Sequence, residues 1–297
     1  AVGDALARIL RSQGAEVFRE YYINDAGRQA RLFGESAYAW SLQLAGQNVL
    51  FPDEAGNYPE GDGYRFPAEG YRGQYVSQVA RANQTAHAAE LHMATPAQAV
   101  EIHRRGGIRQ MVESHRADLE AFGVQFDNWF SEQSLFAEGK VQAALEDLRT
   151  RGFVYEQDRA VWFRSTAFGD DKDRVLIKAD GNPAYIMADI AYHRDKYARG
   201  FDELVDIWGP DHHGYISRMQ AAMRALGHPD GTFTVLIAQQ VNLLEHGKPV
   251  AMSKRAGRFI TLRYLIQDVG RDVARFFFLQ RGTDAHLDFD LDLARKT

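Results

Sequence analysis

The sequence predicts an α/β fold whose parallel sheet is built from strands that alternate with helices. The alternation is clearest after residue 180, where short apolar strands at 204–208 and 233–241 are each preceded by a helical segment. Such alternation is typical of βαβ units and therefore of parallel strands. A long helical stretch, from residue 75 to about 151, separates this half from the first predicted strand. We expect that stretch to be an insertion in the α/β core.

Composition places the chain among globular proteins. Its 297 residues include 35 Lys and Arg against 40 Asp and Glu, a formal net charge of −5, and 45% of them are hydrophobic. These values disfavour a disordered or fibrous chain. The sequence contains no run of about 18 apolar residues, so it predicts no membrane-spanning helix. The absence of cysteine excludes disulfides, thiolate zinc sites and cysteine nucleophiles. Mild acidity disfavours non-specific DNA binding but leaves room for a local basic face.

The first half opens with a helix that ends before Gly14. Its apolar residues recur at helical spacing, namely Val2, Ala5, Leu6, Ile9 and Leu10. Residues 16–23 are rich in Val, Phe, Tyr and Ile and predict a strand, which ends in a turn at 24–27. We then expect a helix over 28–44, loops over 47–74, helices from 75 to about 151 and short strands within 153–179.

In the second half, Asn182 and Pro183 predict an N-cap and a proline at the first position of a helix that runs to about residue 197. A strand at 204–208, a loop at 209–214, a helix at 215–226 and a strand at 233–241 follow. A turn at 245–248 precedes a polar loop at 250–258. Thr261 is a candidate cap for the next helix, and a last helix covers 272–280.

Nucleotide binding, if present, uses neither G-x-x-x-x-G-K-[ST] nor G-x-G-x-x-G, because neither pattern occurs. The strongest polar signal is the loop at 251–257, which holds Ser253, Lys254 and Arg255. Two cations and a hydroxyl in a loop can fold over a polyphosphate and stabilise charge on a leaving group. A solvated basic turn is the simpler alternative.

The segment Trp208–Tyr215 (WGPDHHGY) lies between a predicted strand and a predicted helix. Open α/β sheets bind ligands at this end of their strands. Gly209 would let a ribose or purine approach the backbone, and Asp211 or His212 could bond ribose hydroxyls. A metal site is disfavoured, since adjacent residues do not easily all reach one ion. A helix-capping role for Asp211 is the simpler alternative.

Tyr185 and Asp189 are four residues apart on a predicted helix and so share one face. An aspartate binds a guanidinium in a two-pronged fork, and a tyrosine can lie beside it. The pair suits an arginine side chain. A half-buried tyrosine beside a solvated aspartate is the structural alternative.

Seven segments, taken in order, resemble one family. They read VGDALARIL, EYYINDAGRQ, AYIMADIAYHRDKY, WGPDHHGYISRM, AMSKRAGRFITLRYLI, ARFFFLQR and HLDFDLDLA. Together they resemble the catalytic domain of bacterial-type arginyl-tRNA synthetases, which are class I aminoacyl-tRNA synthetases. The resemblance covers nearly the whole chain.

The resemblance implies a Rossmann-like core with a mostly helical connective insertion and an α-helical C-terminal extension. Residues 251–255 correspond to the K-M-S-K-S signature loop, so Lys254 and Ser253 are implied to be catalytic. Tyr185 and Asp189 match the Y-x-x-x-D positions that hold arginine, and Asn24 and Asp25 are expected near the pocket. The implied ATP-binding residues are Gly209, Asp211, His212, His213, Met252, Lys254 and Arg255.

The implied activity is ATP-dependent ligation of L-arginine to tRNA(Arg) through arginyl-adenylate. Mg²⁺ would enter with ATP, so no metal ligands in the protein are expected. The resemblance further implies a cytoplasmic monomer with no membrane or DNA partner. Expected domains are 1–74 as the first part of the core, 75–179 as the insertion, 180–250 as the second half of the core, and 251–297 as the signature loop and following helices.

Two departures from the family pattern stand out. Ala251 replaces the first lysine of the signature loop, and no H-x-G-H occurs. We expect H-x-G-H and the first core strand just upstream of Ala1, and an anticodon-binding domain after residue 297. The chain is then a catalytic-domain fragment, inactive by itself. One alternative is a truncated paralogue that binds RNA or protein without charging. Another is an α/β nucleotidyltransferase that activates a small molecule without tRNA, which the order of the segments disfavours.

Overall fold

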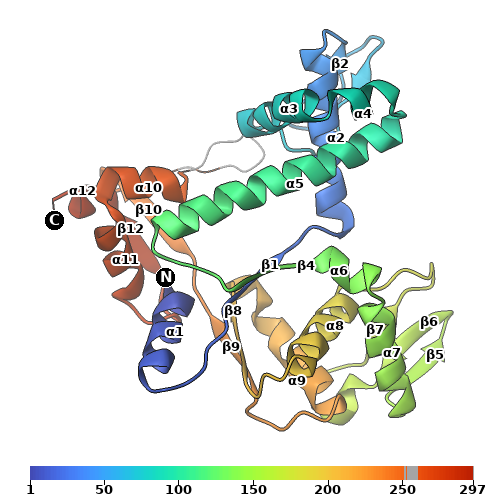
Figure 1. Ribbon diagram of the computed structural model, residues 1–297, viewed down its shortest axis with the longest axis vertical. Coiled ribbons are helices and arrows are strands. Elements are labelled where there is room, and N and C mark those ends of the chain that lie inside the picture. The colour runs from blue at the N-terminus through green and yellow to red at the C-terminus, as the bar shows by residue number, and fades with distance from the viewer. Residues whose placement is uncertain (251, 253–259, 297) are drawn as a thin grey trace. The chain divides into compact units, whose positions relative to one another are not determined.

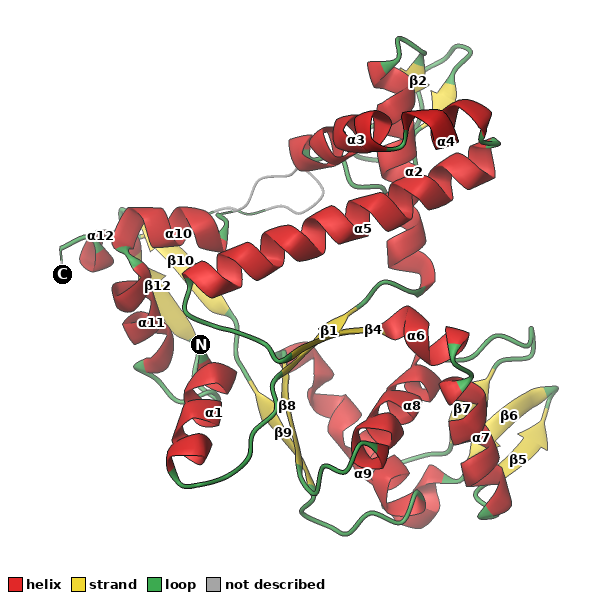
Figure 2. Ribbon diagram, in the orientation of Figure 1, coloured by secondary structure: helices red, strands yellow, loops and turns green. Residues whose placement is uncertain are grey.

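Two compact units make up the residues that the computed structural model describes, which are 1–250, 252 and 260–296 (Figure 1). Unit 1 comprises Ala1–Tyr22, Asn128–Asn242 and Phe278–Phe289, and unit 2 comprises Ile23–Asp127, Leu243–Phe277 and Asp290–Thr297. Each unit therefore combines segments that are distant in sequence. Figure 2 distinguishes the helices from the strands. Every helix in the described part of the chain is too short or too polar to traverse a bilayer.

A parallel pair of strands forms the α/β element of unit 1. β8 (Leu204–Trp208) pairs with β9 (Phe233–Ile237) in register, from Leu204↔Phe233 to Trp208↔Ile237. The chain between them forms a 3₁₀ helix, η2 (Pro210–Tyr215), and then α9 (Ile216–Ala225). This βαβ connection confirms the parallel arrangement that the sequence predicted. The predicted loop at 209–214 is largely the 3₁₀ helix instead.

Helix α8 (Tyr185–Ala198) packs on α7 (Lys140–Thr150) and contributes much of the unit 1 core. Its buried residues are Ile186, Met187, Ala188, Ile190, Ala191, Tyr192 and His193. The predicted helix start at Asn182–Pro183 is wrong. The Asn182 carbonyl accepts from the Lys178 amide at 2.9 Å and Pro183 bridges Ile177, so tertiary pairing holds this segment extended and the helix begins at Tyr185.

The helical prediction for 75–151 is wrong over residues 122–131, where α5 has ended and the chain runs through a loop into a strand. Residues Asn128–Ser131 form β4, which pairs with β1 (Glu20–Ile23). The Trp129 ring stacks on Tyr21 with centroids 4.5 Å apart, and Phe130 is buried. Residues 16–19 lie outside the strand predicted for them. The other elements of unit 1 are α1 (Val2–Ser12), α6 (Glu132–Ala137), β5 (Val154–Gln157), β6 (Ala160–Phe163), η1 (Ser165–Phe168), β7 (Arg174–Ile177) and β12 (Leu287–Asp290).

The strand predicted at 233–241 is broken. β9 ends at Ile237, and β10 (Val241–Glu245) is a separate strand, because the Gln239 amide bonds the Thr283 carbonyl at 3.0 Å instead of extending the parallel pair. β10 then turns back into β11 (Lys248–Pro249), which confirms the predicted turn at 245–248. The strands β5, β6 and β7 form an antiparallel sheet within the region predicted to hold short strands.

Three packed helices form the core of unit 2, namely α2 (Gly27–Leu44), α3 (Gln74–Ala86) and α5 (Pro96–Ala121) (Figure 1). Thr95 caps α5 with a reciprocal bond to Gln98. Thr261 caps α10 (Leu262–Val269) by accepting from the Tyr264 amide at 3.0 Å, as predicted. The remaining elements are β2 (Val49–Leu50), β3 (Tyr64–Arg65), α4 (Ala88–Met93), α11 (Arg271–Leu279) and α12 (Leu291–Ala294). The domain boundaries at 74, 179 and 250 stay predictions.

Candidate functional site

The N-terminal end of α8 carries the two residues predicted to bind arginine. Tyr185 is the first residue of the helix and is 74% exposed, whereas Asp189, one turn later, is half-buried. The Tyr215 hydroxyl, at the end of η2, donates to Asp189 Oδ2 at 2.7 Å. Burial raises the pKa of Asp189, and the Tyr215 bond opposes that rise. Among the described residues, no lysine, arginine or histidine forms an ion pair with this carboxylate.

One turn further along α8, His193 forms a buried polar cluster with the strand β8. His193 Nδ1 lies 2.7 Å from the Asp189 carbonyl oxygen, and Nε2 lies 2.7 Å from Asp206 Oδ2. Lys196 Nζ donates to Asp206 Oδ1 at 2.8 Å. Burial acts to raise the pKa of Asp206, but His193 and Lys196 overcome it and hold that pKa well below its usual range.

The segment predicted to bind ATP follows the carboxyl end of β8, where ligands bind in open α/β sheets. Gly209 precedes η2, and Asp211, His212 and His213 are exposed on it. Asp211 Oδ2 lies 3.6 Å from His212 Nε2. The capping role considered for Asp211 is wrong, because α9 begins after Tyr215 without a side-chain cap.

The remaining predicted site residues belong to unit 2 or lie outside the described residues. Asn24 is exposed, and the half-buried Asp25 accepts at its carbonyl from Arg104 at 2.7 Å. Met252 is 48% exposed. Ser253, Lys254 and Arg255 lie outside the described residues. The structure thus brings Tyr185 and Asp189 onto one helix with Tyr215 against the carboxylate, and the role of each predicted residue stays a prediction.

Sequence reasoning missed His193, Lys196 and Asp206 as candidate site residues, and it included Tyr215 only as the end of the candidate segment 208–215. Two signals were present. His193 continues the four-residue spacing of Tyr185 and Asp189, and Asp206 is a charge inside the apolar strand LVDIW. A charge in such a strand requires a buried partner, and His193 and Lys196 provide it.

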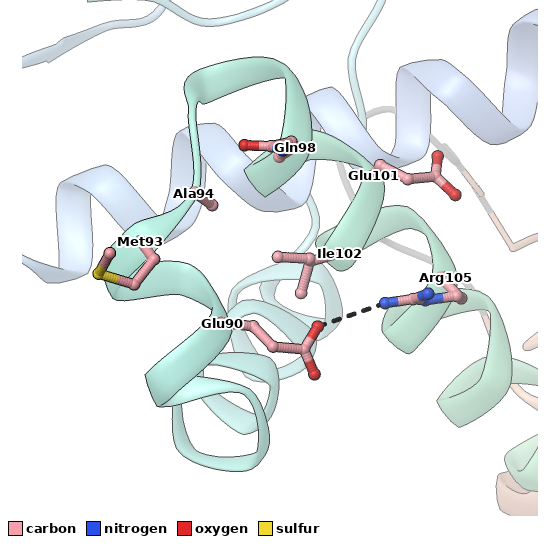
Figure 3. Close-up of a pocket in the computed structure, with 7 residues that line it drawn as sticks. All are labelled: Glu90, Met93, Ala94, Gln98, Glu101, Ile102 and Arg105. Atoms are coloured by element: carbon pink, nitrogen blue, oxygen red, sulfur yellow. Dashed lines mark hydrogen bonds and ion pairs between the residues drawn. The ribbon is translucent and has the colours of Figure 1, made fainter.

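A separate hollow of about 380 Å³ lies between α4 and α5 in unit 2 (Figure 3). Its lining residues are Glu90, Met93, Ala94, Gln98, Glu101, Ile102 and Arg105, and Glu90 pairs with Arg105 at 3.4 Å. None of the predicted site residues lines it. Across residues 1–250, 252 and 260–296, no three histidine, aspartate or glutamate side chains come together as a metal site.

A comparison with protein families identifies the chain. The model of class I (R) tRNA synthetase catalytic domains matches residues 99–285, which is more than half of the chain. The chain belongs to the class I (R) tRNA synthetase catalytic-domain family. Class I aminoacyl-tRNA synthetases use ATP, and this membership confirms the α/β class I fold that the resemblance implied.

Curated relatives of this synthetase domain are arginine–tRNA ligases. The chain is 48% identical over 297 residues to the ligase of Solidesulfovibrio magneticus, and 44% identical over 296 residues to that of Geobacter sp. strain M21. Both matches cover 100% of this chain and 51% of the relative. The chain therefore spans about half the length of these relatives.

Solved structures give the same family. A Campylobacter jejuni structure given as an arginyl-tRNA synthetase superposes with a TM-score of 0.83 at 34% identity, covering 98% of this chain and 60% of that one. The Thermus thermophilus arginyl-tRNA synthetase superposes with a TM-score of 0.67 at 18% identity, covering 99% of this chain and 56% of that one, which supports the fold alone. The resemblance to arginyl-tRNA synthetases is confirmed.

Proposed function

We propose that the protein carrying this chain ligates L-arginine to tRNA(Arg), with ATP as the energy source and Mg²⁺ entering with ATP. Arginine's carboxylate would attack the α-phosphorus of ATP, forming arginyl-adenylate as the α–β phosphoanhydride bond breaks and pyrophosphate leaves. A terminal ribose hydroxyl of the tRNA would then attack the arginyl carbonyl carbon and release AMP. The whole protein would act as a cytoplasmic monomer.

The single observation that carries this proposal is that the half-buried carboxylate of Asp189 forms no ion pair with any residue that the structure describes. A half-buried carboxylate normally pairs with a cation, because burial of an unpaired charge is costly. Asp189 instead accepts from a neutral hydroxyl, that of Tyr215, at 2.7 Å. A guanidinium from a ligand would supply the missing charge. Tyr185, exposed one turn earlier, would line the same slot.

The segment after β8 fits a nucleotide. Gly209 and Gly214 lack side chains that would keep a ligand from the backbone, and a Cβ at Gly214 would meet no heavy atom within 4 Å. His212 and His213 are exposed beside them and could donate to ribose or phosphate oxygens. Bound Mg²⁺ would neutralise phosphate charge, and the chain's own residues would position and stabilise rather than form a covalent intermediate.

The test is aminoacylation of a tRNA(Arg) transcript by the intact protein, with arginine, lysine and citrulline offered separately. We expect charging with arginine alone, and ATP–pyrophosphate exchange that depends on arginine. Asp202→Asn is a matched control, because Asp202 is an exposed carboxylate in the loop before β8. Charging with another amino acid contradicts the proposal. Binding of tRNA without any charging would instead favour the alternative of a non-catalytic RNA-binding paralogue.

A further inference from the structure

The His193 ring faces hydrogen-bond acceptors on both sides. Its Nδ1 lies 2.7 Å from a backbone carbonyl oxygen, that of Asp189, which never donates. Its Nε2 lies 2.7 Å from Asp206 Oδ2. The other oxygen of Asp206 accepts from the Lys196 ammonium at 2.8 Å, and its neighbours hold the pKa of Asp206 well below its usual range. Asp206 is therefore ionised, and each ring nitrogen of His193 lies at hydrogen-bond distance from an oxygen acceptor, so both bonds form only when both nitrogens carry a proton.

A ring that donates from both nitrogens carries two protons and a positive charge. The side chain of His193 is only 4% exposed, so solvent screens this charge weakly. With Lys196 and ionised Asp206, the cluster keeps one net positive charge. That charge lies next to Asp189, whose own carbonyl binds the ring.

We propose that His193 is a positioning residue whose imidazolium, clamped by Asp206, keeps the carboxylate of Asp189 ionised and ready for a guanidinium. The inference rests on the proposed function, since it assigns a support to the residue proposed to bind arginine. Asp189 needs this support because burial favours its neutral form. A protonated Asp189 would offer arginine no counter-charge.

The surroundings of Asp189 agree with this role. Tyr215 donates to it from η2, and the positive charge of His193 stabilises the ionised form more than the negative charge of Asp206 destabilises it. His212 on η2 adds a weaker effect in the same direction.

The other faces of the His193 ring are aromatic. Tyr192 on α8 and Phe233 on β9 meet the ring edge-on, with centroids 5.4 and 5.0 Å away. The rings of Tyr192 and Phe233 shield the imidazole of His193 from water, and they carry no charge that would act on it. Within the part of the chain that the structure describes, Asp206 and Lys196 bond in this cluster and Asp189 is the further carboxylate that interacts with His193.

The first measurement uses the wild-type protein and needs no variant. With ¹⁵N-labelled histidine, we expect both ring nitrogens of His193 to give signals of the protonated type at neutral pH. One signal of the unprotonated type would overturn the proposal, whether or not any His193 variant folds.

The second measurement compares His193→Gln with wild type. Glutamine can donate to Asp206 but carries no charge. By ¹³C NMR without arginine, the carboxyl of Asp189 should titrate about one pH unit higher in the variant. In parallel, the arginine KM of the variant should rise steeply towards acidic pH and approach the wild-type value at alkaline pH. A purely structural role would raise KM equally at every pH, and that result would overturn the proposal.

Tyr192→Phe is the matched control on the same helix. It removes a partly buried hydrogen bond, from the Tyr192 hydroxyl to Glu20 Oε1 at 2.6 Å, and keeps the ring that packs on His193. Its pH profile should match wild type. If this control shifts the titration of Asp189 as far as His193→Gln does, the charge of His193 is not the cause. If the titration shifts as expected but arginine does not bind, the proposed function fails while the electrostatic role stands.

Discussion

Asp189→Asn tests the proposed arginine slot by removing one charge at nearly constant shape. The Tyr215 hydroxyl that now donates to Asp189 Oδ2 can donate equally to an amide oxygen, so the local packing should persist. Because the site is half-buried, a bound guanidinium that lost the carboxylate of Asp189 would have little solvent to replace it. Leaving a charged partner without its counter-charge costs about 3–5 kcal/mol in such a setting. Arginine binding should therefore weaken roughly 100-fold to several thousand-fold, at about 1.4 kcal/mol per tenfold.

Citrulline makes the experiment specific. It has nearly the shape of arginine but is neutral, so it would bring no positive charge to pair with the carboxylate of wild-type Asp189. In Asp189→Asn the amide can bond the neutral urea group of citrulline. The ratio of kcat/KM for arginine to that for citrulline should therefore fall by about 100-fold or more. Asp189→Ala should lose arginine without gaining citrulline or lysine, because it offers neither charge nor acceptor.

The assay is steady-state adenylate formation with tRNA present, run with arginine, citrulline and lysine on both variants. The exposed Asp202→Asn again serves as the control. Arginine kinetics within about twofold of wild type in Asp189→Asn would refute the reasoning, since the carboxylate of Asp189 would then have no consequence for arginine binding.

Three further outcomes are expected. Lys254→Ala should slow arginine-dependent pyrophosphate exchange by about 100- to 1000-fold while changing arginine affinity little, and an unchanged exchange rate would contradict the signature-loop role. Burial lowers the pKa of His103 from 6.5 to about 4, so the folded ring stays neutral where the unfolded chain binds a proton. The free energy of unfolding should thus fall by about 3 kcal/mol as the pH drops from 6.5 to 4, and urea titrations of His103→Gln should lack that slope. Gly106→Ala should destabilise unit 2 by about 1–3 kcal/mol in the same assay, because its Cβ would lie 2.3 Å from Asn83 Oδ1, and a loss near zero would contradict this close packing.

Local chemistry explains which elements the sequence predicted correctly. The cap at Thr261 was predictable because its bond to the Tyr264 amide closes within one helical turn. The parallel pairing of the strands predicted at 204–208 and 233–241 was predictable because each is a short apolar run with a helical segment between them, although the second strand ends at Ile237. In these places the residues that determine the structure are neighbours in the chain.

The errors occur where distant pairing overrides local preference. Asn182–Pro183 has the form of a helix start, yet the bridge from Pro183 to Ile177 keeps it extended. The strand β4 was missed because its partner is β1. The bond from the side-chain Nδ2 of Asn128 to Glu20 Oε2, which joins the two strands, spans 108 positions of sequence. Local propensity carries no information about such a partner.

In the candidate site, too, local spacing predicted some features and contacts between distant residues determine the others. The Y-x-x-x-D spacing predicted that Tyr185 and Asp189 share a helix face, and the structure places them one turn apart on α8. The same four-residue spacing continues to His193, which is buried. This face of α8 therefore begins with the exposed ring of Tyr185 and ends with the buried imidazole of His193. The buried charge depends on Asp206 of β8, a contact that helical periodicity does not reveal. Residues that face a ligand follow the local repeat of the helix, whereas the residues that set their charge come from whichever element packs behind them. The sequence therefore predicts which residues line this slot but not which charged groups surround them. The ionisation of Asp189 depends on the packing of the folded unit and not on the Y-x-x-x-D motif alone.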